Sequence, residues 1–211
     1  MLAALFVVFG LAVWVAGQRG ESLPTGAQRL GPEAGERVAD YLRRAGASLP
    51  AGNSAPVWAL VQLKDYLTPE PAAELARGVR VSRVVLRVPL PRVQTALITR
   101  DLPGQRPVAE LTEVLRSAAQ DRATVASRGV PGDRPAAVAA AEAAQLRAGC
   151  ACVVAFLVFG DGEALQAVAA RPGVRAVHAA SPDTPLQDVA TSPLLPEQVG
   201  MAGPVPDDGP V

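Results

Sequence analysis

The 211-residue sequence predicts an α+β domain made of two strand–helix–strand units, preceded by one membrane-spanning helix. Two observations predict this arrangement. An uncharged, apolar run occupies residues 1–17. The order strand, helix, glycine and Val-Arg strand then occurs twice, over residues 57–90 and again over residues 150–181. Such a recurrence within one chain indicates an internal repeat.

The apolar run at residues 1–17 reads MLAALFVVFGLAVWVAG. As a helix it would be about 26 Å long at 1.5 Å per residue, close to the roughly 30 Å hydrocarbon core of a bilayer. No Lys or Arg precedes it, and it is longer than the apolar part of a usual signal peptide. We therefore interpret it as an uncleaved signal-anchor. A signal cleaved near Ala16 and a buried core helix are the alternatives.

Two features of the sequence predict opposite orientations for this anchor. Arg19 and Arg29 follow the run, and the positive-inside rule places their side of the membrane in the cytoplasm. Apolar runs at the very start of a chain, however, commonly export the residues that follow them. We favour the second reading, which gives a single-pass protein of the cell membrane with an extracytoplasmic body.

Residues 18–56 are expected to be a linker that contains one short amphipathic helix. The helix covers residues 32–48. It is indicated by apolar side chains at the i, i+3, i+4 and i+7 spacing, which share one face: Val38, Tyr41, Leu42 and Ala45.

The first strand–helix–strand unit covers residues 57–90. Its opening run, VWALVQLKDYL, is typical of a strand, and TPEPAAELARG then predicts a short helix. Thr68 is the expected N-cap of that helix, and Gly78 is its expected end. The following VRVSRVVLRVPL predicts a second strand, which Pro89 ends.

The second unit, over residues 150–181, repeats the same order. CACVVAFLVFG predicts a strand, DGEALQAVAARPG a helix with Asp161 as its N-cap, and VRAVHAAS another strand. An alignment of Thr68 with Asp161 also places Glu70 on Glu163, and both glutamates complement a helix dipole. We interpret the two units as a duplication.

Two such units in one small domain suggest the ferredoxin-like arrangement βαββαβ, with an antiparallel sheet and both helices on one face. In that arrangement the first strand of each unit is central and the second lies at an edge. Residues 150–159 are apolar on both faces, as a central strand is. Charged or polar residues mark the second strands as edges: Arg83, Arg87, Arg175 and His178.

The domain is thus predicted to span residues 57–181, with a helical-hairpin insertion at about 91–149. Apolar positions at helical spacing from Val108 onward predict its first helix, and an alanine-rich run that Gly149 closes predicts its second. Residues 182–211 contain seven prolines and predict a disordered or polyproline-like tail.

Several segments resemble uncharacterised single-pass membrane proteins of high-GC actinobacteria. They are the apolar N-terminus, the strand VWALV, the run VRVSRVVLRVP and the run VFGDGEALQAVAARPGVRAV. In the body the resemblance covers residues 57–90 and 150–181. It implies a membrane location and carries no functional residues with it, because none are known for such proteins.

Cys150 and Cys152 are the only cysteines and the one candidate site. On a strand their Cα atoms would lie about 6.6 to 7 Å apart, at the limit of disulfide geometry. A pair of buried free thiols, a strained or redox-active disulfide, and a metal site are the three readings. His178, the sole histidine, cannot complete a usual four-ligand site with two thiols, so we expect no metal and no cofactor.

The remaining features exclude some classes of function and favour others. Twenty basic residues balance twenty acidic ones, so no basic field predicts nucleic-acid binding. His178 has no identifiable catalytic partner, and Gly160-Asp161-Gly162 is read as a tight turn with a helix cap. We therefore expect a non-enzymatic, membrane-anchored interaction or sensing module with a protein partner. A redox or metal-handling protein that uses the cysteine pair is the alternative, and a propeptide-like protease inhibitor is the third reading.

Overall fold

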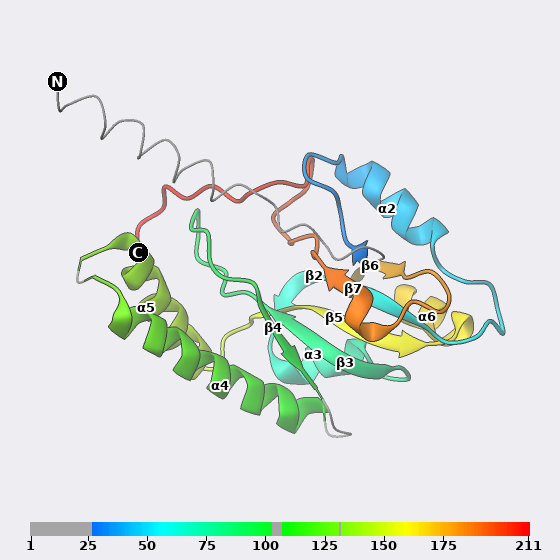
Figure 1. Cartoon of the computed structure of the whole chain (residues 1–211), viewed down its shortest axis with the longest axis horizontal. Coiled ribbons are helices and arrows are strands. Elements are labelled where there is room, and N and C mark those ends of the chain that lie inside the picture. Colours follow the sequence, from blue (N-terminus) through cyan, green and yellow to red (C-terminus); the bar gives the residue numbers. More distant parts are fainter. Residues whose placement is uncertain (1–26, 103–106, 131) are drawn as a thin grey trace.

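The computed structural model describes residues 27–102, 107–130 and 132–211, which form an α+β domain with two sheets (Figure 1). The apolar run at residues 1–17, expected to be a transmembrane helix, lies outside these residues. Among the residues that are described, no helix is both long and apolar enough to cross a bilayer.

The larger sheet has five strands, all paired antiparallel, in the order β4-β3-β5-β2-β6. The strands are β2 (Val57–Leu67), β3 (Arg80–Leu86), β4 (Ile98–Asp101), β5 (Val153–Gly160) and β6 (Val174–Ala179). Of the three inner strands, β5 is buried on both faces along its length, and β2 is buried on both faces over residues 57–63. This explains why their sequences are apolar at nearly every position rather than at alternate ones.

The two repeated units are β2–α3–β3 and β5–α6–β6, in which α3 is Pro69–Leu75 and α6 is Gly162–Ala169. The Asp161 side chain caps α6 as expected, since it accepts a hydrogen bond from the Ala164 amide at 2.8 Å. The first strand of each unit is central, which confirms that prediction. The prediction that both second strands are edges is right for β6. It is wrong for β3, because β4 pairs along its outer side.

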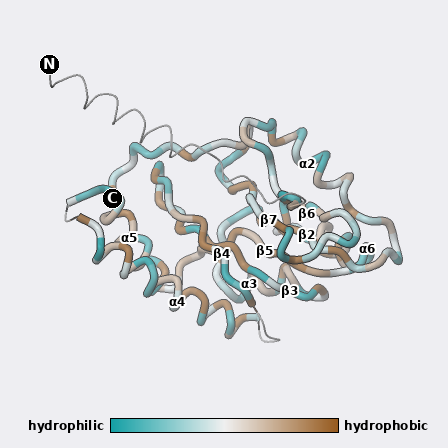
Figure 2. Tube along the Cα trace, in the orientation of Figure 1, coloured by the Kyte–Doolittle hydropathy of each residue, from teal (hydrophilic) through white to brown (hydrophobic). Residues whose placement is uncertain are grey.

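One face of the large sheet is covered by helices. The insertion forms the expected hairpin of α4 (Pro107–Arg128) and α5 (Arg134–Arg147), but it also contributes strand β4 before these helices. In Figure 2 the tube of α4 alternates between hydrophobic and hydrophilic colours, as a helix with one face on a core does. The helices and the sheet share one apolar cluster, which includes Ala72, Leu111, Leu115, Leu146, Phe156, Leu165 and Val168.

The second face is covered by segments from both ends of the described chain. Strand β1 (Gln28–Leu30) pairs in parallel with β7 (Val189–Thr191), which follows the short 3-10 helix η1 (Leu186–Asp188). Helix α2 (Val38–Ala47) packs beside them on β6. The apolar side chains on this side include Leu30, Trp58, Leu60, Leu157, Val189 and Leu195.

Two predicted boundaries are corrected by this covering layer. The expected amphipathic helix is present, with Val38, Tyr41 and Ala45 buried, but it begins at Val38 rather than at residue 32, and it is part of the domain rather than of a linker. The expected disordered tail at residues 182–211 instead includes β7 and places Leu194 fully inside the body. The physical reason is the same in both cases, since the apolar second face of the sheet must be shielded from water.

The turn after β1 contains a glycine that no other residue can replace without strain. Gly31 has φ near 131°, and a Cβ atom there would lie 1.7 Å from the carbonyl oxygen of Ser192. The two segments of the chain approach this closely because the Ser192 amide donates to the Leu30 carbonyl at 2.8 Å.

We expect Gly31→Ala to lower the free energy of unfolding by about 2 to 4 kcal/mol, because it adds both a clash and a disfavoured φ. Urea denaturation of the purified full chain measures this. Gly46→Ala is the matched control, since Gly46 lies in α2 and a Cβ atom added there would meet nothing within 4 Å apart from its chain neighbours and the backbone of its own helix. It should stabilise by up to about 1 kcal/mol. Equal effects of the two changes would contradict the close approach.

Candidate functional site

Cys150 and Cys152 are joined by a disulfide in the structure, with their Cα atoms 5.3 Å apart. Strand β5 begins at Val153, and the bend at Ala151 brings the two Cα atoms closer than they would be on a strand. The two cysteines are therefore not free thiols in the structure. Cys152 has no exposed surface and lies in the apolar cluster. A cysteine in such surroundings is poorly reactive, so its position favours a structural disulfide.

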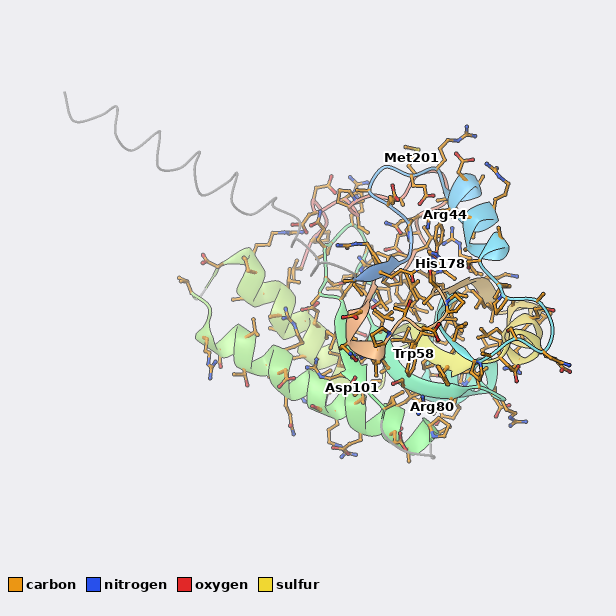
Figure 3. All side chains as sticks on the ribbon, turned by 45° about the vertical axis from the view of Figure 1, so that its right-hand side comes forward. Arg44, Trp58, Arg80, Asp101, His178 and Met201 are labelled. Atoms are coloured by element: carbon orange, nitrogen blue, oxygen red, sulfur yellow. A yellow bond between two sulfur atoms is a disulfide. The ribbon has the colours of Figure 1, made fainter. Side chains whose placement is uncertain are left out.

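His178 is not the exposed edge histidine that the sequence indicates. It is 4% exposed, because α2 covers the face of β6 that carries it. Its Nδ1 accepts a hydrogen bond from the Gly31 amide at 3.0 Å, and its ring meets the Tyr41 ring edge-on. Burial, reinforced by the nearby Arg44 guanidinium, lowers the pKa of His178 to about 4. The residue is therefore neutral at pH 7 and serves as an acceptor. Figure 3 labels His178 among the side chains of the body.

Gln62, on the same face of the sheet, connects two covering segments. Its side-chain Nε2 donates to the Tyr41 hydroxyl at 2.5 Å, and its Oε1 accepts from the Leu194 amide at 2.6 Å. Burial raises the pKa of Tyr41 to about 12, so its hydroxyl stays protonated. Gln62 thus ties both α2 and the C-terminal segment to strand β2.

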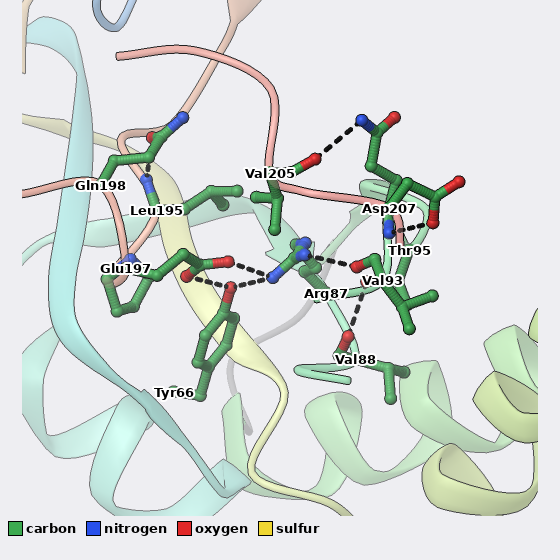
Figure 4. A network of polar contacts seen from close by, with 12 residues as sticks. Tyr66, Arg87, Val88, Val93, Thr95, Leu195, Glu197, Gln198, Val205 and Asp207 are labelled. Carbon is green, nitrogen blue, oxygen red and sulfur yellow. Dashed lines mark hydrogen bonds and ion pairs between the residues drawn. The ribbon is translucent and has the colours of Figure 1, made fainter. Parts of the chain in front are cut away.

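Arg87 is the most buried charge on this face, at 3% exposure. Figure 4 shows its polar contacts. It donates to the Tyr66 hydroxyl at 2.5 Å, to the Glu197 carboxylate at 2.5 Å and to the Val93 carbonyl at 3.1 Å. Tyr66 also donates to Glu197, at 2.9 Å. Burial raises the pKa of Tyr66, although the Arg87 cation opposes the rise.

Glu197 belongs to an extended segment that we name the strap, residues 193–211. Each acidic residue of the strap pairs with an arginine of the body: Glu197 with Arg87, Asp207 with Arg134, and Asp208 with Arg92. The hydrogen bonds from Arg134 and Arg92 hold the pKa values of Asp207 and Asp208 below the usual range.

Body side chains also hold the backbone of the strap. Arg175 donates to the Leu195 carbonyl at 2.7 Å and to the Gln198 carbonyl at 2.5 Å. Gln94 donates from its side chain to the Val205 carbonyl at 2.7 Å. Arginine is suited to binding backbone carbonyl groups because its planar guanidinium presents several N–H donors at once. The surface therefore recognises both the charges and the main chain of an extended segment.

Spaces remain between the strap and the body. A cavity of about 380 Å³ lies beside Tyr66, Leu90, Val205 and Pro206, and another of about 260 Å³ lies around Gln94, Arg134 and Asp207. The Nε of Arg134 is enclosed without a hydrogen-bond partner among the described residues. The strap is thus less tightly packed than a protein core.

A larger cavity of about 640 Å³ lies on the helical side, between the start of α3 and the α4–α5 hairpin. Its charged lining residues, Glu70, Arg116 and Arg147, carry both signs and are exposed. No lining residue there is a buried charge, so this cavity offers less specific chemistry than the strap surface. Within the described ranges, no group of three or more His, Cys, Asp or Glu residues is placed to hold a metal ion.

Comparison of the chain with protein-family models, with curated proteins and with solved structures finds no match. Function is therefore inferred from the chemistry of the strap surface. Sequence reasoning identified Arg87 only as an edge marker and did not identify Glu197 or Asp207. One signal was present: Arg87 lies between the apolar residues Leu86 and Val88, and an arginine that is buried in such a run needs a charged or polar partner.

Removal of the negative charge of Glu197 tests the buried cluster. Glu197→Gln keeps the shape of the side chain but leaves the Arg87 cation among neutral partners, so we expect a loss of about 2 kcal/mol in unfolding free energy. Urea denaturation measures it. Glu113→Gln, which breaks the exposed pair with Arg116, is the matched control and should cost less than about 0.5 kcal/mol. Similar losses for both variants would argue against a special role of the cluster.

The low pKa of His178 predicts a pH dependence of stability. The unfolded chain binds a proton near pH 6.5 and the folded chain near pH 4, so stability is complete above pH 6.5 and falls as the pH falls toward 4. The expected loss between pH 7 and pH 5 is about 2 kcal/mol. His178→Asn retains an acceptor that does not titrate, and its stability should fall less over this range. A wild-type curve parallel to that of the variant would show that His178 does not contribute.

Proposed function

We propose that the protein is a membrane-anchored, non-enzymatic interaction or sensing module with a ferredoxin-like body that binds a polypeptide segment of a protein partner. The fold assignment is supported by the order β6-β2-β5-β3 of the repeated strands, with both connecting helices on one face. Strand β4 extends that sheet on the side of β3.

The observation that carries this proposal is the way in which the body holds the strap. Arginines of the body pair with all three acidic residues of the strap. Arg175 and Gln94 donate hydrogen bonds to backbone carbonyl groups of the strap. These are the contacts of a peptide-recognition surface. The described polar groups of highest burial, including His178 and Gln62, have structural partners instead of an arrangement that activates a nucleophile.

The membrane part of the proposal rests on the apolar run at residues 1–17. Nine residues separate this run from Ala27, where the described body begins. Even when fully extended, they would span only about 30 Å. An anchored body would therefore meet its partner close to the bilayer surface, on the side that we propose to be extracytoplasmic.

Topology fusions to the full chain test the anchor. With alkaline phosphatase or a fluorescent protein fused after Val211, we expect the chain to resist carbonate extraction, the phosphatase to be active and the fluorescent protein to be dark. Val8→Asp places a charge within the run, which costs about 3 kcal/mol at the centre of a spanning helix, and should shift the protein to the soluble fraction.

The reverse pattern of fusion signals would contradict the extracytoplasmic placement. Release of the wild-type protein by carbonate, or its accumulation in a form shortened at the N-terminus, would contradict the anchor itself. Val8→Asp separates these outcomes from overexpression artefacts, because it differs from the wild type at one position in the run.

A further inference from the structure

The distal part of the strap, residues 203–211, differs from the rest of the second-face layer in how it is held. It reads GPVPDDGPV. The preceding part of the strap has Leu194, Leu195 and Ala202 buried, whereas the one large side chain of the distal part that is half-buried is Val205. Apolar burial therefore fixes the start of the strap and contributes little to its distal part.

Polar contacts at the rim hold the distal strap instead. The Arg92–Asp208 pair is 62% and 63% exposed, and the Arg134–Asp207 pair is 39% and 44% exposed. Exposed ion pairs of this kind contribute at most about 1 kcal/mol each. The cavities of about 380 and 260 Å³ flank the same residues. The distal strap is therefore positioned specifically but held weakly.

The body surface beneath the distal strap nevertheless makes specific hydrogen bonds to it. Arg134 donates to the Asp207 carboxylate at 3.0 Å and to the Gly209 carbonyl at 2.9 Å. Gln94 donates its backbone amide to the same carboxylate at 3.0 Å and its side-chain amide to the Val205 carbonyl. In return, the Gly209 amide donates to the Arg92 carbonyl at 2.7 Å. The surface thus binds the carboxylates of Asp207 and Asp208 together with the extended main chain around them.

Proline and glycine in the occupant suit this geometry. Pro204, Pro206 and Pro210 have no amide hydrogen to satisfy and favour an extended backbone. Gly209 approaches the body so closely that a Cβ atom there would lie 2.2 Å from the Pro91 carbonyl oxygen. The occupant that fits best is therefore an acidic segment with prolines and a glycine after its acidic pair.

We propose that this surface is a docking site for an acidic, proline-containing segment of a partner protein, and that residues 203–211 occupy it in cis until the partner displaces them. This inference rests on the proposed function, since it names the partner class of the interaction module. An attached segment competes at an effective concentration in the millimolar range, so cis occupancy keeps the site closed to weak ligands.

The test uses the full chain in detergent micelles and, as probe, a fluorescently labelled synthetic peptide of sequence GPVPDDGPV. Fluorescence anisotropy at low salt measures its binding. Asp207→Asn with Asp208→Asn weakens the cis segment. Glu70→Gln with Glu163→Gln removes the same charge from exposed positions on the helices and is the matched control.

We expect the strap variant to bind the peptide at least tenfold more tightly than the wild type and the control. Arg92→Gln with Arg134→Gln, added to the strap variant, should abolish this binding. A peptide with both aspartates replaced by asparagine should fail to bind the strap variant. Binding should also weaken at 0.5 M salt, because the ion pairs are exposed.

Equal binding by the strap variant and the control would overturn cis competition, and binding that survives loss of Arg92 and Arg134 would overturn the site. A wild-type dimer that the peptide dissociates would identify a second copy of this chain as the occupant and overturn the assignment to another protein. These results do not depend on the anchor, which the fusion experiment tests, so the two proposals fail separately.

Discussion

Both faces of the five-stranded sheet are apolar, but the two repeated units supply helices to one face only. The rest of the structure depends on how the other face is covered. Strand β1, helix α2, strand β7 and the strap carry out this task, and they come from the two ends of the described chain. Burial of such a face removes apolar area from water at roughly 25 cal/mol per Å², so leaving it open would be costly.

The polar residues on this second face then determine which segment lies where. His178 accepts from the turn after β1, Gln62 binds both α2 and the start of the strap, and Arg87 pairs with Glu197 further along. Each is buried, and an unpaired group at any of these positions would destabilise the fold. Apolar contact therefore drives the covering of the face, while these three residues fix the register of the covering segments.

The parts of the fold that could be predicted from the sequence are those with local signals. Helical periodicity identified α2 and the α4–α5 hairpin, and the repeated order of elements identified β2, β3, β5 and β6. Strand β4 could not be found in this way, because its four residues carry no distinct pattern and pair with a strand that was expected to be an edge. For the site, the sequence singled out the cysteine pair, whereas the strap surface depends on long-range contacts such as that of Arg87 with Glu197, which is 110 positions away. Proline content predicted disorder for the strap because composition does not reveal such contacts.

The parallel pairing of β1 with β7 has a mechanical consequence. Leu30 lies opposite Thr191, and the strap begins two residues later at Pro193. The point at which the chain enters the body is thus next to the root of the strap. Tension transmitted along the polypeptide from the N-terminal side of Gln28 would be borne first by this three-residue pairing and by the Gly31–His178 hydrogen bond. The N-terminal entry of the chain into the body and the start of the strap therefore share one junction, so a load applied at the first would act directly on the second.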